Sequence, residues 1–149
     1  MSAVRLESRL SRRVLQVSER RIVVLDSSVG VKWIKPEAGR DVALALLRKH
    51  RDGAVRLVVA SQFLHEVVAV AVRRGGAGLG RKTWASLAAA ELTTIGLDGR
   101  LAEATFEQCT LLNCTFYDAL APALAEQLGA TLYSADARAH AQFSGVQLI

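Results

Sequence analysis

The chain has 149 residues, of which 51% are hydrophobic and 22% charged, a composition that predicts one folded domain and excludes a disordered chain. No stretch reaches the ~20 apolar residues that span a bilayer, and no signal peptide is evident, so we expect a cytoplasmic protein without a membrane partner. Two cysteines, Cys109 and Cys114, do not make a disulfide framework, and we expect small buried thiols.

The formal net charge of +5 is concentrated near the N-terminus. Residues 1–21 carry six arginines and two glutamates, hence a net charge of +4, which leaves +1 for the remainder. Leu6, Leu10, Val14 and Val17 follow at helical spacings. We therefore predict that residues 1–21 form a basic helical extension packed on the body or on a partner chain. The alternative is an arm that contacts the phosphates of RNA.

The first element of the body is a short apolar run. Ile22 to Leu25 are consecutive apolar residues, a pattern typical of a buried parallel strand. Asp26 follows directly, and Ser27 and Ser28 are placed to cap a helical turn that Pro36 ends.

The middle of the chain alternates helical and strand patterns. The predicted elements are a helix over 38–51, a strand over 56–59, and helices over 61–74 and 81–91. The glycine-rich segment 75–80 superficially resembles a dinucleotide-binding loop, but it follows a helix instead of a strand. We therefore predict a turn between two helices there.

The last third of the chain continues the alternation. The predicted elements are strands over 93–97, 130–133 and 146–148, and helices over 100–112, 115–127 and 137–142. We expect Thr115 to cap the helix that carries Asp118 and Gly129 to end it. Pro122 lies inside this helix, removes the bond to the carbonyl of Asp118 and is expected to kink it. Strands alternating with helices predict an α/β domain with a parallel sheet.

Four acidic residues from distant segments are predicted to meet at one edge of that sheet. Asp26 and Asp136 follow strands, and Glu66 and Asp118 lie in the first turns of helices. Ligands of parallel sheets gather at the carboxyl ends of the strands, so these carboxylates can converge. Converging carboxylates repel one another unless a cation offsets them, and oxygen ligands suit Mg²⁺ or Mn²⁺. Such a site can hydrolyse a phosphate ester.

Each acid also has a purely structural interpretation. Asp118 can complement its helix dipole, Glu66 can be a surface residue, and Asp136 can belong to a turn. Asp26 is the firmest candidate because it directly follows an apolar strand.

Four short segments resemble the motifs of the PIN-domain family, in the same order. They are Val23–Val29, Phe63–Val68, Thr115–Leu120 and Leu132–Asp136. The subgroup that this chain most resembles is the VapC-type toxins of toxin–antitoxin pairs. The resemblance covers residues 22–149 and implies a PIN-like nuclease domain, a three-layer α/β/α sandwich with a central, mainly parallel sheet.

The resemblance also implies an activity, site residues and partners. It implies a Mg²⁺- or Mn²⁺-dependent endoribonuclease that cleaves RNA phosphodiester bonds. The residues assigned to catalysis and metal binding are Asp26, Glu66, Asp118 and Asp136. The supporting residues are Ser28 and Ser134, which orient the acids, and Arg138, which contacts phosphate. The implied partners are RNA, an antitoxin whose tail occupies the acidic groove, and a second copy in a homodimer.

Three departures from the family leave an alternative open. About 21 residues precede the first strand, Ala69 and Val70 stand where the family often has an asparagine, and Pro122 interrupts a helix. The alternative is a PIN-like scaffold, weak or inactive in catalysis, that binds RNA or a partner protein. Phosphatases of the haloacid dehalogenase type are a poorer match, because they need a second aspartate where Ser28 stands.

Overall fold

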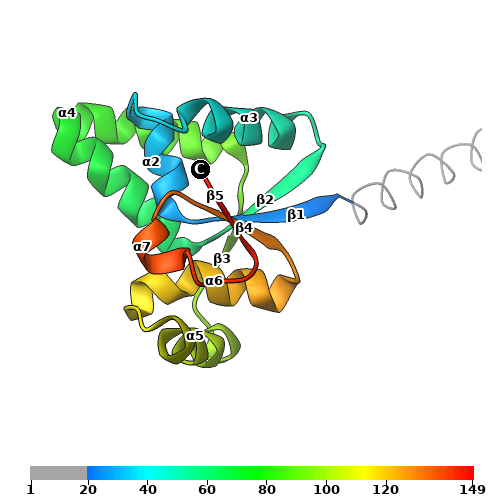
Figure 1. Cartoon of the computed structure of the whole chain (residues 1–149). Helices are drawn as coiled ribbons and strands as arrows, with labels where there is room; N and C mark the ends of the chain where they lie inside the picture. The colour runs from blue at the N-terminus through cyan, green and yellow to red at the C-terminus, as the bar shows by residue number, and fades with distance from the viewer. Residues whose placement is uncertain (1–19) are drawn as a thin grey trace, which may run out of the picture.

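The computed structural model describes residues 20–149, in which a five-stranded sheet is covered by helices on both faces (Figure 1). The strands are β1 (Arg21–Leu25), β2 (Val55–Ala60), β3 (Thr93–Ile95), β4 (Thr131–Ser134) and β5 (Val146–Leu148). All neighbours are parallel, and their order is β3-β2-β1-β4-β5. The predicted three-layer α/β/α sandwich is confirmed. The predicted helical extension lies, up to residue 19, outside the described residues, and Arg21 already belongs to β1.

The sheet separates two hydrophobic cores, because alternate strand residues point to opposite faces. The helices are α2 (Ser27–Ile34), α3 (Arg40–Arg51), α4 (Ser61–Ala90), α5 (Gly99–Leu112), α6 (Phe116–Leu128) and α7 (Ala137–His140). Val23 and Leu25 pack in the core that α2, α3 and α4 cover. Val24 and Leu132 pack in the core under α5 and α6. Among the described residues, no helix is long and apolar enough to cross a membrane.

Helix α4 changes direction at two glycines. Gly75 (φ −141°, ψ 20°) and Gly76 (φ 68°, ψ −170°) leave the helical region, and the helix then resumes. The turn predicted over 75–80 is therefore confined to its first two residues. Gly80 packs on the first arm, since a Cβ there would lie 2.6 Å from Cγ2 of Val72. The kink thus lets the two arms of α4 approach closely.

Both ends of α6 follow local sequence signals, whereas the start of α2 does not follow the predicted one. Thr115 caps α6 by accepting a hydrogen bond from the N–H of Asp118 (3.1 Å), and Gly129 ends it with φ 58°. Both were predicted. The cap of α2 is Asp26 itself, so the prediction that Ser27 or Ser28 caps this helix is wrong. Helix α6 is assigned as one helix through Pro122.

Candidate active site

Asp26 lies at the carboxyl end of the central strand. Its Oδ2 accepts a hydrogen bond from the N–H of Ser28 (3.0 Å), and its own N–H donates to the carbonyl of Tyr133 (3.0 Å). Its side chain lines a small hollow together with Glu66 and Tyr117. The structure therefore brings two of the four predicted acids to one place.

Both carboxylate oxygens of Glu66 have hydrogen-bond donors. The hydroxyl of Ser27 donates to Oε2, and the amide nitrogen of Gln62 donates to Oε1 (2.7 Å). Sequence reasoning did not single out Ser27 or Gln62 as supporting residues. Gln62 precedes Glu66 by one helical turn, and this four-residue spacing was the available signal. The orienting contact comes from the turn before Glu66, whereas the family pattern predicts an asparagine one turn after it.

Ser28, at the start of α2, and Ser134, the last residue of β4, link the segments that follow the first and fourth strands. Oγ of Ser28 accepts a hydrogen bond from the N–H of Ala135 (2.9 Å), and Oγ of the fully buried Ser134 accepts one from the N–H of Asp136 (3.0 Å). The two hydroxyl oxygens are 3.5 Å apart. The Oδ1 of Asp136 accepts from the N–H of Ala139 (3.1 Å), which caps α7.

A buried histidine, which sequence reasoning did not identify, links Asp118 to this network. Ring nitrogen Nε2 of His140 lies 2.6 Å from the carbonyl oxygen of Asp118, and Nδ1 lies 2.7 Å from Oγ of Ser134. A carbonyl only accepts, so Nε2 carries the hydrogen. Pro122 has no N–H to give the carbonyl of Asp118 its helical bond, and His140 supplies the missing donor. This histidine therefore compensates for the proline.

Asp118 itself is half-buried and lies in the first turn of α6. Burial raises the pKa of the Cys114 thiol, and the negative charges of Cys109 and Asp118 raise it further. Asp118 therefore lies near the α5–α6 connection. Both cysteines are free and only half-buried, so the thiols predicted to be buried are covered in part. Arg138 is exposed on α7.

The donor chemistry of the hollow suits a hard cation. Asp26 and Glu66 offer carboxylate oxygens, and Mg²⁺ is usually held by one or two carboxylates while it keeps several waters. Over residues 20–149, no group of three or more His, Cys, Asp or Glu side chains is close enough to hold a metal ion. Asp26 and Glu66 are the two predicted acids that line this hollow together, and the four-acid metal site stays a prediction.

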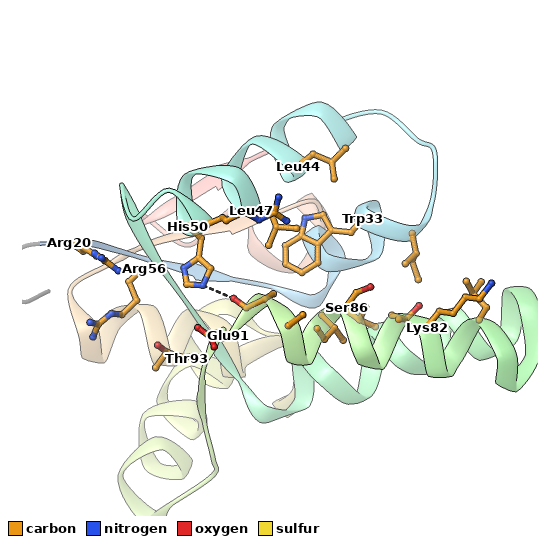
Figure 2. Close-up of a pocket in the computed structure, with 18 residues that line it drawn as sticks. Arg20, Trp33, Leu44, Leu47, His50, Arg56, Lys82, Ser86, Glu91 and Thr93 are labelled. Atoms are coloured by element: carbon orange, nitrogen blue, oxygen red, sulfur yellow. Dashed lines mark hydrogen bonds between the residues drawn. The ribbon is translucent and has the colours of Figure 1, made fainter.

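A second, larger groove lies between α3 and the second arm of α4 (Figure 2). It has a volume of about 1000 Å³, and its apolar lining includes Trp33, Leu47 and Leu87. The charged residues that line it are Arg20, Arg51, Arg56, Lys82 and Glu91. Four basic groups against one acid make this groove cationic.

His50 fixes one end of this groove. Its Nδ1 accepts a hydrogen bond from the N–H of Leu57 (3.2 Å), so Nε2 donates to the carbonyl of Ala90 (3.0 Å; Figure 2). The histidine thereby joins α3, β2 and the end of α4.

These features define an α/β protein with acidic residues at the carboxyl edge of a parallel sheet, where such folds bind their ligands. The family model of the PIN domain matches residues 23–145, and the chain belongs to the PIN domain family. None of the curated proteins matches the sequence.

Solved structures share this fold at low sequence identity. VapC20 of Mycobacterium tuberculosis, described as a toxin that cleaves the sarcin–ricin loop, superposes with a TM-score of 0.63 at 17% identity over 80% of this chain and 93% of that one. A DNA-bound VapBC of Salmonella typhimurium has a TM-score of 0.65 at 15% identity, and the match covers 87% of this chain and 97% of that chain. A toxin–antitoxin complex from Klebsiella pneumoniae has a TM-score of 0.61 at 17% identity, and the match covers 84% of this chain and 95% of that chain.

Proposed function

We propose that this chain is a divalent-metal-dependent endoribonuclease of the cytoplasm and the toxin of a VapBC-type pair. The observation that carries the proposal is the hollow at the carboxyl edge of the sheet, which Asp26 and Glu66 line together. Membership of the PIN domain family supports it, as does the likeness to a toxin described as cleaving the sarcin–ricin loop.

The proposed roles keep the four acids together. Asp26 and Glu66, which line the hollow, hold Mg²⁺ or Mn²⁺ together with Asp118 and Asp136. When bound, such an ion offsets the negative charge that builds on a phosphodiester during hydrolysis. Ser27 and Gln62 keep the carboxylate of Glu66 oriented. Ser28 and Ser134 hold the Asp136 segment against β1, and Arg138 contacts a substrate phosphate.

Cleavage of RNA by the purified chain tests this proposal. With Mn²⁺ present the protein should cut single-stranded RNA, and Asp26→Asn should lower kcat by at least about 100-fold, as loss of one group that stabilises transition-state charge does. Asp41→Asn, an exposed acid on α3, is the matched control and should cut normally. Equal cleavage by the Asp26→Asn protein, or undiminished cleavage in EDTA, would contradict the metal-nuclease proposal.

The second candidate is a PIN-like scaffold that binds RNA or a protein without cutting. It is favoured by the departures from the family pattern near two of the acids, namely Ala69 and Val70 one turn after Glu66 and Pro122 one turn after Asp118. RNA that stays bound and intact in Mn²⁺ would support this candidate over the first.

Besides the acidic hollow, where the tail of the antitoxin is expected, the groove of Figure 2 offers a second surface for this partner. An apolar lining with four basic side chains and one acidic one is complementary to an amphipathic segment that carries acidic residues. The structural neighbours from Klebsiella pneumoniae and Salmonella typhimurium are toxin–antitoxin assemblies, which supports a partner of this kind. We also propose that the chain forms a homodimer.

A further inference from the structure

Three aromatic rings form a continuous row beside the acidic hollow. Phe106 on α5 lies 5.5 Å from Phe116 between ring centroids, and Phe116 lies 6.4 Å from Tyr117 at the start of α6. The outer rings are open to solvent, with Tyr117 67% exposed and Phe106 55% exposed. Phe116 is partly buried against the core and holds the row in place. We call these three residues the aromatic row.

One end of the aromatic row reaches the acidic hollow. Tyr117 lines that hollow together with Asp26 and Glu66. An exposed apolar side chain is common on protein surfaces and by itself indicates nothing. Here the rings contact one another and border a hollow with two carboxylates. A ligand that lies on Tyr117 therefore also lies beside Asp26 and Glu66, which indicates a binding surface.

We propose that the aromatic row is a stacking platform for the unpaired bases of single-stranded RNA, with Tyr117 receiving the base nearest the acidic hollow. This inference rests on the proposed ribonuclease function and adds a binding subsite: the side chains on which unpaired bases of the substrate stack. Every base has a π-face that stacks on an aromatic ring, and single-stranded RNA is recognised in this way by many folds.

The size of the aromatic row favours bases over a second copy of the chain. Large aromatic side chains bury about 150–250 Å² each, so the exposed parts of Tyr117 and Phe106 together offer on the order of 250 Å². A stable protein–protein interface needs about 800 Å² on each partner. The aromatic row is therefore too small for a dimer interface of its own, whereas two rings match two bases.

Binding of RNA without cleavage tests the aromatic row directly. The probe is a short fluorescein-labelled single-stranded RNA of mixed sequence, measured by anisotropy with the full-length protein in EDTA. Tyr117→Ala should weaken binding by roughly five- to hundred-fold, the loss of one stacked base. Tyr117→Phe keeps the ring and should restore the affinity. Trp84→Ala removes an aromatic side chain that is 54% exposed on α4 and is the matched control.

Two further measurements separate stacking from a general loss of structure. An RNA made abasic at successive positions should lose affinity at one position for the parent protein, and Tyr117→Ala should bind that RNA no worse than the parent does. In Mn²⁺, Tyr117→Ala should raise KM for RNA and leave kcat unchanged, because stacking contributes to ground state and transition state alike.

Some outcomes would overturn the stacking proposal. Tyr117→Ala that binds RNA as tightly as the Trp84→Ala control would refute it. A Tyr117→Ala protein that changes its oligomeric state while its RNA affinity stays constant would reassign the aromatic row to contact between copies. Cleavage with an unchanged KM in Tyr117→Ala would sink this inference alone. Tyr117-dependent binding without cleavage would sink the nuclease proposal and keep the platform.

Discussion

At the scale of single residues, the pairing of Pro122 with His140 connects the two sides of the site. The proline leaves the carbonyl of Asp118 without a helical donor, and the histidine ring donates to it while it contacts Ser134. Proline in a helix is visible in the sequence, but its compensating partner lies 18 residues further on and no local pattern marks it. The orphaned carbonyl therefore serves as an attachment point between α6 and α7.

This pairing gives a stability prediction. His140→Ala should lower the free energy of unfolding by about 2–4 kcal/mol, because it leaves the Asp118 carbonyl without the ring donor and removes one partner of the buried Ser134 hydroxyl. In a Pro122→Ala background the same change should cost about 1 kcal/mol less, since residue 122 can then donate to that carbonyl. Urea unfolding of the four proteins measures both values.

The control for these four proteins is His65→Ala. His65 is an exposed histidine on α4, and its replacement should change the free energy of unfolding by less than about 0.5 kcal/mol. If His140→Ala costs no more than the control, the ring does not stabilise the fold. Purely additive effects would show that Pro122 and His140 are independent.

At the scale of elements, the conformation of Gly76 explains the shape of α4. Its φ of 68° with ψ of −170° lies in a region that is essentially restricted to glycine, and a Cβ there would meet nothing within 4 Å. The strain of a substitution would therefore be confined to the backbone. Gly78 has equally open surroundings but no positive φ, which makes it a matched comparison.

Two glycine substitutions should therefore have opposite signs. Gly76→Ala should lower the free energy of unfolding by about 1–3 kcal/mol, because alanine is strained in this conformation. Gly78→Ala should raise it by about 0.5–1 kcal/mol, because alanine favours a helix over glycine. Thermal unfolding followed by circular dichroism compares the two variants, and a stabilising Gly76→Ala would contradict the observed kink.

The elements also show how far sequence reasoning reaches. The cap at Thr115, the stop at Gly129 and the strand over 146–148 rest on neighbouring residues, and all three were predicted correctly. The bond from Ser27 to Glu66 spans 39 positions, so it depends on how the sheet and α4 come together in space. The acids show the same division. The predicted parallel arrangement of the strands places Asp26 and Glu66 at one edge of the sheet, but the motifs do not indicate which side chains surround them.

At the scale of the whole molecule, the order of the strands sets how stability is distributed. The central strand β1 pairs with β2 and β4, whereas β5 pairs only with β4. Val24 is fully buried in β1, and Leu148 in β5 is 38% exposed. Regions with few buried contacts open locally, while central strands open only when the whole domain unfolds.

Hydrogen exchange should reproduce this gradient. The amides of β1 should exchange only through global unfolding, with a free energy of about 5–15 kcal/mol, and those of β5 should exchange faster through local opening. Amide exchange followed by NMR resolves the two strands. Faster exchange in β1 than in β5 would contradict the strand order.

The central place of β1 also has a consequence for the timing of synthesis. Residue 26 is made early, yet its N–H bonds to Tyr133 and the neighbouring Ser28 contacts Ser134 and Ala135. Until the segment that carries Tyr133, Ser134 and His140 has been made, one edge of β1 has no neighbour and the carbonyl of Asp118 lacks its histidine partner. The edge of the sheet that carries Asp26 is therefore completed only after residues 107 positions further along the chain have been made, as the bond from Ala135 to Ser28 shows.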